Sequence, residues 1–276
     1  MLKQVKPTTA GRRNQIQVDR SGLHKGKPEK SLLAVGHKKR QGRNSTGRIT
    51  VRHRGGGVKK KMRVIDFRRD KVNVMGVVKR IEYDPMRSAW IALVFYVDGD
   101  KRYMLAPEGL KIGDKVMASE KAEITPGNTL PLREISIGEA IHNIEIEPGK
   151  GARMVRAAGT AAYIQAKDEK FATVLLPSKE IRLFKLESLA TVGQVGNQDH
   201  QNQKLGKAGR KRLAGIRPGV RGTAMHPGAH PHGGGEGRSG VGMKYPKTPW
   251  GKHALGKKTR RKSRSNKMIV RDRRTK

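Results

Sequence analysis

The positive charge of this chain is segregated into its two ends, and this feature limits what the chain can fold into. The 276 residues carry a formal net charge of +38. By segment, the net charge is +15 over residues 1–60, +3 over 61–130, 0 over 131–200 and +20 over 201–276. Like charges repel one another, so we expect the two ends to stay extended until an anion neutralises them. Only the middle of the chain has the charge balance of an ordinary globular protein.

The composition indicates a nucleic-acid partner. Aromatic residues make up 4% of the chain and hydrophobic residues 34%, so part of the chain has to be unstructured or to fold against a partner. Nucleic acid suits so basic a chain, because each Lys or Arg that contacts a phosphate releases counterions. A membrane surface is the weaker alternative, because no basic amphipathic helix is visible. No apolar run approaches the roughly 20 residues that span a bilayer. The absence of cysteine excludes disulfides and thiolate metal sites.

Short apolar runs predict a first small barrel over residues 61–127. Strands are predicted for residues 63–67, 74–81, 91–97 and 103–106, and residues 111–116 are predicted to form a turn into another strand. The third run ends at Asp98-Gly99, a dipeptide that favours a tight hairpin turn. About five short strands between polar turns are typical of a Greek-key barrel of the oligonucleotide-binding type.

A second set of short runs predicts another small barrel over residues 128–197. Its predicted strands are residues 141–146, 154–157, 162–166, 171–176 and 181–186. Their spacing of about ten residues, with polar turns between them, favours a compact β domain. Because no long segment has the helical period, we predict a mainly β fold with basic extensions at residues 1–60 and 198–276.

Arginine and glycine alternate in the N-terminal extension, which favours contact with RNA. The residues concerned are Arg43, Arg48, Arg52, His53, Arg54, Gly55, Gly56 and Gly57. Glycine lets the backbone approach a phosphate closely, while arginine binds it through two hydrogen bonds. A flexible basic linker is the alternative, but charge and Gly-Arg interleaving together favour RNA. The triple glycine lacks the Gly-Lys-Ser/Thr of a nucleotide-binding loop.

A loop rich in histidine, proline and glycine over residues 222–238 carries the strongest local signal. It cannot form a helix or an interior strand, so a partner surface has to define its shape. Histidine and arginine side chains stack on unpaired bases. We therefore predict RNA contacts in and beside this loop from Arg217, Arg221, His226, His230, His232 and Arg238.

Metal binding and general-base catalysis are the two other chemistries open to the same histidines. Three histidines can bind a transition metal, but Glu236 is the one carboxylate nearby. A histidine general base needs an orienting carboxylate, and the residue before His230 is Ala229. We therefore predict neither a metal site nor a catalytic residue.

The C-terminal part of the basic extension adds one aromatic residue and a cationic run. Trp250 lies among basic residues and is a candidate for stacking on a base. Packing of Trp250 on the protein's own surface is the alternative, and the sequence does not decide between them. We also predict RNA contacts from Lys257, Lys258 and Arg260, and a short strand over residues 269–271.

The order of these motifs resembles the family of the universal large-subunit ribosomal protein two, in its bacterial or organellar form. The resemblance covers nearly the whole chain. It is carried by residues 42–44, 47–50, 55–57, 65–67, 81–85, 87–89, 103–107, 149–151, 153, 157–159, 230–238, 248–251 and 257–260.

The resemblance implies an oligonucleotide-binding-type barrel followed by an SH3-like barrel in a structural ribosomal protein that is not an enzyme. It implies primary binding of large-subunit ribosomal RNA, with Arg153 among the contacts, and support for assembly, subunit association, tRNA binding and the peptidyl transferase region. The implied partners are this RNA, neighbouring ribosomal proteins, the small subunit and tRNA. No cofactor is implied beyond magnesium associated with the RNA.

One position departs from the family, and two questions stay open. The family commonly has Asp where this chain has Ala229, which weakens a proton-relay role for His230. We expect a cytoplasmic bacterial ribosome, with a mitochondrial or plastid ribosome as the alternative. A free-standing nucleic-acid chaperone or packaging protein is the alternative function, but the non-repeating motifs of the extensions favour one fixed RNA shape.

Overall fold

Contacts within the chain divide it into two units. The computed structural model describes residues 2–34, 40–257 and 264–274. The first of the two units, here called the barrel unit, comprises residues 1–38, 59–207 and 265–276. The second, here the arm unit, comprises an N-terminal arm of residues 39–58 and a C-terminal arm of residues 208–264.

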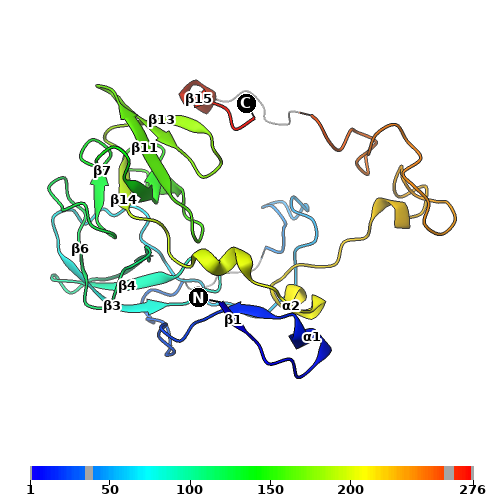
Figure 1. Cartoon of the computed structure of the whole chain (residues 1–276), viewed down its shortest axis with the longest axis horizontal. Coiled ribbons are helices and arrows are strands. Elements are labelled where there is room, and N and C mark those ends of the chain that lie inside the picture. The colour runs from blue at the N-terminus through cyan, green and yellow to red at the C-terminus, as the bar shows by residue number, and fades with distance from the viewer. Residues whose placement is uncertain (1, 35–39, 258–263, 275–276) are drawn as a thin grey trace. The chain divides into compact units, whose positions relative to one another are not determined.

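A curled four-stranded antiparallel sheet forms the first barrel (Figure 1). Its order is β5-β4-β3-β6, with β3 at Gly76–Glu82, β4 at Ile91–Tyr96, β5 at Lys101–Leu105 and β6 at Lys115–Val116. The β4–β5 hairpin turns at Asp98-Gly99, where Gly99 has φ +87°. Buried Val78, Val94 and Val116 belong to the hydrophobic core inside this barrel.

A seven-stranded sheet forms most of the second barrel (Figure 1). Its order is β15-β13-β12-β11-β8-β14-β7. The bounds are β7 Thr129–Pro131, β8 Ala140–His142, β11 Ala162–Lys167, β12 Phe171–Leu175, β13 Ile181–Lys185, β14 Leu189–Val192 and β15 Ile269–Arg271. Alternating residues of these strands point inward, and Ile141, Ile164, Val174 and Phe184 are buried in one core.

The remaining elements are short. Two small antiparallel pairs occur, β1 (Leu2–Gln4) with β2 (Ile16–Val18), and β9 (Ile144–Glu145) with β10 (Ala152–Met154). The helices are α1 Ala10–Arg13, η1 Gln198–Asn202, α2 Ala208–Leu213, η2 Gly222–Ala224 and η3 Arg264–Met268. Across the described residues, no helix is long and apolar enough to span a membrane.

The predicted fold class is confirmed: the chain is mainly β, with an oligonucleotide-binding-type barrel followed by an SH3-like barrel. Three strand predictions were wrong in detail. The strand predicted at residues 154–157 lies earlier, as β10, which ends at Met154 because Val155 turns the chain with φ +53°. Residues 63–67 form no strand, because they make only single bridges, from Arg63 to Leu33 and from Ile65 to Tyr103. The predicted strand 141–146 is interrupted at Asn143, whose φ of +51° turns the chain between β8 and β9.

One further strand was predicted from the sequence, and two strands were missed. The strand predicted at residues 269–271 is β15, which pairs with β13. The sequence did not indicate β7 or β14, because both strands are short. β7 has three residues and ends at Pro131, and β14 has four residues. The boundaries proposed between domains stay a prediction.

Backbone hydrogen bonds and one shared cluster join the two barrels. Gly196 N–H donates to the Ala106 carbonyl at 2.9 Å, and Ala152 N–H donates to the Phe67 carbonyl at 2.8 Å. Leu105 of the first barrel and Val195 of the second are buried in one cluster, against which Phe67 packs. Phe67 therefore lies where the two barrels meet.

One buried histidine links the stability of the second barrel to pH. His142 in β8 is fully buried, and its Nδ1–H donates to the Gly193 carbonyl at 2.7 Å. Burial lowers the pKa of His142 to about 4. Unfolding returns the imidazole to an ordinary pKa of about 6.5, so the unfolded chain binds a proton that the folded chain lacks. Stability should therefore fall as the pH drops from about 6.5 towards about 4.

Replacing this histidine should remove that part of the pH dependence. Compared with His142→Gln, the natural chain should lose about 1.4 kcal/mol more of its unfolding free energy per pH unit below pH ~6.5. Urea unfolding followed by circular dichroism at pH 7.0, 6.0 and 5.0 measures this difference. Equal slopes for the two proteins would show that His142 is not buried in its neutral form.

Candidate nucleic-acid interface

The structure gathers most of the predicted RNA-contacting residues into the arm unit. Of the predicted set, Arg153 alone belongs to the barrel unit, and Lys258 and Arg260 lie outside the described residues. The remaining residues are Arg43, Arg48, Arg52, His53, Arg54, Gly55, Gly56, Gly57, Arg217, Arg221, His226, His230, His232, Arg238, Trp250 and Lys257.

The N-terminal arm contains a tight loop that presents arginines to solvent. Thr50 and Val51 donate their N–H groups to the Gly42 carbonyl at 2.8 and 3.0 Å. The Asn44 side chain accepts from the Arg48 N–H at 2.9 Å. Gly42 has φ +76°, and a Cβ there would lie 2.1 Å from the Val51 carbonyl oxygen, so the loop requires glycine. The loop leaves Arg43 and Arg48 exposed.

Beyond this loop, the two arms pair with each other through their backbones. Arg217 N–H donates to the His53 carbonyl at 2.9 Å, and Gly55 N–H donates to the Gly215 carbonyl at 3.0 Å. The guanidinium of Arg52 lies 5.6 Å from the centre of the Trp250 ring. Residues about 160 positions apart in the sequence therefore share one exposed basic surface.

Histidine side chains hold the shape of the C-terminal loop. His226 Nδ1 accepts from Gly228 N–H at 3.1 Å, and His230 Nδ1 accepts from His232 N–H at 3.0 Å. His232 Nε2 accepts from Lys247 N–H at 2.8 Å. His230 is 7% exposed, and its ring packs directly on Gly222. Each of these histidines thus uses a ring nitrogen to fix the backbone.

This geometry bears on the metal and catalytic hypotheses. No group of three His, Asp or Glu in the described part of the chain is placed to hold a metal ion. The lone pairs that a metal or a substrate proton would need already accept backbone N–H groups. The arrangement therefore serves the structure of the loop.

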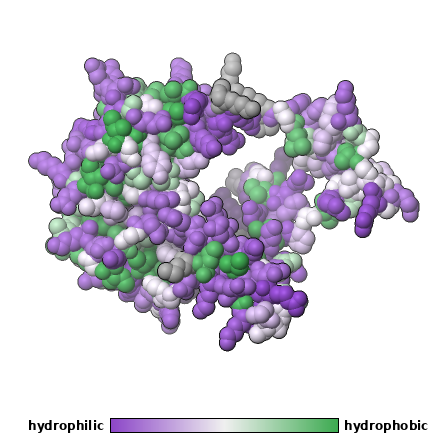
Figure 2. All heavy atoms as spheres, in the orientation of Figure 1, coloured by the Kyte–Doolittle hydropathy of each residue, from purple (hydrophilic) through white to green (hydrophobic). Residues whose placement is uncertain are grey.

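Trp250 does not pack into the protein's own surface. Its side chain is 72% exposed, with the Arg52 guanidinium near its ring. An exposed indole beside a cation offers a platform on which a base can stack. The exposure of Trp250 therefore favours the hypothesis that it stacks on a base. Figure 2 shows that hydrophilic residues dominate the face of the molecule in view.

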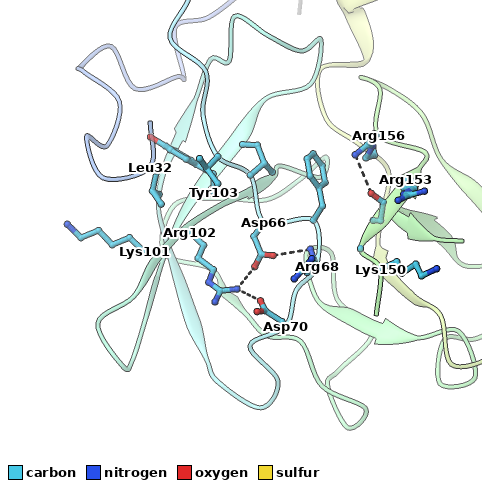
Figure 3. Close-up of a pocket in the computed structure, with 15 residues that line it drawn as sticks. Leu32, Asp66, Arg68, Asp70, Lys101, Arg102, Tyr103, Lys150, Arg153 and Arg156 are labelled. Carbon is cyan, nitrogen blue, oxygen red and sulfur yellow. Dashed lines mark hydrogen bonds and ion pairs between the residues drawn. The ribbon is translucent and has the colours of Figure 1, made fainter. Parts of the chain in front are cut away.

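Arg153 belongs to a second basic surface, a cleft between the barrels (Figure 3). The cleft has a volume of about 740 Å³. Its wall includes Phe67 and Tyr103 from the first barrel and Gly151 from the second. The cations that line it are Arg68, Lys101, Arg102, Lys150, Arg153 and Arg156.

The cations of the cleft differ in how they are neutralised. Burial disfavours the charge of Arg102, but hydrogen bonds to Asp70 and Asp66 hold its pKa above the ordinary value. Arg156 has the opposite balance, because burial and the charges of Arg87 and Arg153 lower its pKa. An anion that enters beside Arg156 would relieve this repulsion.

Sequence reasoning missed several residues that line this cleft, and Arg87, which contacts Phe67 of its wall. The guanidinium groups of Arg156 and Arg87 lie 4.5 and 5.4 Å from the centre of the Phe67 ring. Arg68 and Arg102 also line the cleft or contact its acids. The three-residue spacing of Arg153 and Arg156 was the one available signal, because packing of the barrels brings the other residues together.

The comparisons with known proteins agree with this geometry, and they confirm the resemblance seen in the sequence. The family model described as "Ribosomal Proteins L2, RNA binding N-terminal domain" matches residues 29–118, and "Ribosomal Proteins L2, C-terminal domain" matches residues 125–251. The chain is 54% identical to the large ribosomal subunit protein uL2 of Dinoroseobacter shibae over all 276 residues, which cover 98% of that protein. The chain therefore belongs to the ribosomal protein L2 family.

Proposed function

We propose that this chain is a structural constituent of the large ribosomal subunit and a primary binder of its ribosomal RNA. One observation carries the proposal: the 21 Lys and Arg of the arm unit share a single carboxylate, Glu236. Such a surface cannot neutralise itself, and phosphates are its natural counterions. The cleft at Phe67 and Arg156 supplies a second anion-facing surface in the barrel unit.

The same proposal covers the finer roles expected of the family. The chain supports assembly, association with the small subunit, tRNA binding and the peptidyl transferase region, beside neighbouring ribosomal proteins. It acts without catalysis of its own, because the lone pairs of the histidine loop are used by backbone N–H groups. Magnesium associated with the RNA is the one ion it meets. The location is a bacterial cytoplasmic ribosome, with an organellar ribosome as the alternative.

A free-standing chaperone or packaging protein is the competing function. Such a protein binds many sequences and needs no defined loop shape. The arm unit instead has specific internal hydrogen bonds, such as those at Gly42 and His230, which suit one RNA surface. The difference is one of specificity, so it can be measured by competition.

Competition between RNAs tests the proposed function. A transcript of large-subunit ribosomal RNA and a scrambled RNA of equal length should both bind with a steep dependence on salt, because phosphate contacts dominate both. At about 0.2 M salt the ribosomal transcript should bind at least about 100-fold more tightly, as in specific nucleic-acid complexes. Equal affinities at every salt concentration would favour the packaging function.

Arg156 should contribute a phosphate contact in the cleft. Arg156→Met keeps apolar contact with Phe67 but removes the charge. It should weaken binding to the ribosomal transcript by about tenfold and lower the slope of log affinity against log salt by about 1. Filter binding at four salt concentrations gives both quantities.

Arg133 provides the matched control for this variant. It is an exposed arginine outside the cleft, and it already pairs with Glu120 and Glu134. Arg133→Met should leave the affinity and the salt slope within experimental error of the natural chain. Equal losses in the two variants would mean that Arg156 acts through net charge alone.

His230 should affect the yield of active particles and leave the chemical step intact. His230→Ala removes the acceptor that holds the His232 N–H, whereas His230→Asn places an amide oxygen near the same position. The alanine variant should assemble fewer active subunits, and the asparagine variant should recover part of that yield. The rate of peptide-bond formation per active particle should stay within about threefold in both, far from the loss of about 100-fold or more expected for a missing general base.

Single-turnover kinetics on purified particles decide between these roles. A 100-fold slower chemical step in both variants, with one titrating group lost from the pH profile, would overturn the positioning role. Loss of yield in the alanine variant with normal chemistry per particle would support it.

A further inference from the structure

The two arms meet at a crossing that only glycine can form. The glycine crossing, defined here as residues 53–58 with residues 213–217, contains Gly57 at φ +78°. A Cβ on Gly57 would lie 2.8 Å from the Leu213 carbonyl oxygen and 2.9 Å from the Gly215 nitrogen. Both neighbours are backbone atoms, so neither can move aside as a flexible side chain could. Alanine at position 57 therefore cannot occupy the crossing as it stands.

Backbone hydrogen bonds on both sides of Gly57 hold the crossing. Val58 N–H donates to the Leu213 carbonyl at 3.0 Å, and the bonds of Gly55 and Arg217 continue the pairing. Arg54 and Ile216 form an antiparallel bridge within it. The contact is thus a short piece of β pairing between arms that are remote in sequence.

The crossing brings cations of both arms to one place. Arg52 and Arg54 flank His53 on the N-terminal arm, and Arg217 pairs with His53 from the C-terminal arm. The side chains of all three arginines are exposed. Clustering of cations without a matching carboxylate costs free energy, and a bound polyanion removes that cost.

We propose that the two arms bind RNA as one composite site, which the glycine crossing assembles and which the phosphate backbone of ribosomal RNA occupies. This inference rests on the proposed function and adds that neither arm is an independent ligand for RNA. Contacts from Arg52 and Arg54 then depend on the C-terminal arm, and the contact from Arg217 depends on Gly57. Independent arms would instead contribute separately to affinity.

A mutant cycle on the full chain tests this dependence, with Gly56→Ala as the matched control for Gly57→Ala. Gly56 also has a positive φ, +62°, but among the described residues beyond its chain neighbours no atom lies within 4 Å of a Cβ built there. Arg217→Ala should weaken binding to the large-subunit ribosomal RNA transcript by about tenfold in the natural chain and in Gly56→Ala. In Gly57→Ala the same change should cost less than about twofold, because the composite site is already lost. A tenfold loss in all three backgrounds overturns the composite site.

A cross-link provides a second test that does not depend on the stability of Gly57→Ala. The chain has no cysteine, so Arg54→Cys with Ile216→Cys gives a single thiol pair. These two residues are bridge partners, at a spacing that a disulfide can span. The oxidised chain should bind the transcript at least as tightly as the reduced chain, because the bond locks the arms as they pair in the site. Loss of binding on oxidation, restored by reductant, overturns the proposal.

RNA specificity and coupling between the arms are separate properties, and each can be absent without the other. If the natural chain does not distinguish the ribosomal transcript from scrambled RNA, the proposed function fails. If it does distinguish them, but Arg217→Ala acts equally in every glycine background, the composite site alone fails.

Discussion

Mutual repulsion among cations is the constraint on which the rest of this structure depends. In the barrel unit, carboxylates lie close to the basic side chains: Arg102 contacts Asp66 and Asp70, and Lys71 contacts Asp98 and Asp100. The arm unit has one carboxylate in its sequence against 21 cations. We therefore expect the barrels to fold as protein alone and the arms to need an external anion to hold the same compactness.

The arms solve a second problem, which is how to hold a shape without an apolar core. Glycines at the crossing let backbone approach backbone, and histidines in the C-terminal loop accept backbone N–H groups. Both devices leave the charged side chains outside and exposed. When RNA neutralises the charge of the arms, these backbone contacts define the shape that the arms adopt.

Much of the fold was predictable because it follows from local pattern. The apolar run at residues 91–97 and its Asp98-Gly99 turn became β4 and its hairpin. The run at residues 63–67 also contains strand-favouring residues, but it makes only single bridges, since pairing is decided by distant strands. Residue type alone cannot supply that information.

The candidate site was also predictable only in part from the sequence. Net charge and glycine content pointed to the arms, but the pairing of Gly55 with Gly215 has no periodic signature in either segment. The cleft around Phe67 was missed because Arg87 and Arg156 come from different barrels and meet only when those barrels pack. Contacts between remote backbone groups and between packed domains are therefore what the sequence left undetermined.

Amide hydrogen exchange with and without ribosomal RNA measures whether the two arms become ordered together on RNA, with the buried strands β4 and β12 as internal standards. The barrels should exchange slowly under both conditions. Residues 40–58 and 208–257 should exchange fast in the free chain, and become protected at Gly55, Val58 and Arg217 when the RNA binds. Full protection of the arms without RNA, or protection of one arm alone with it, would contradict the account.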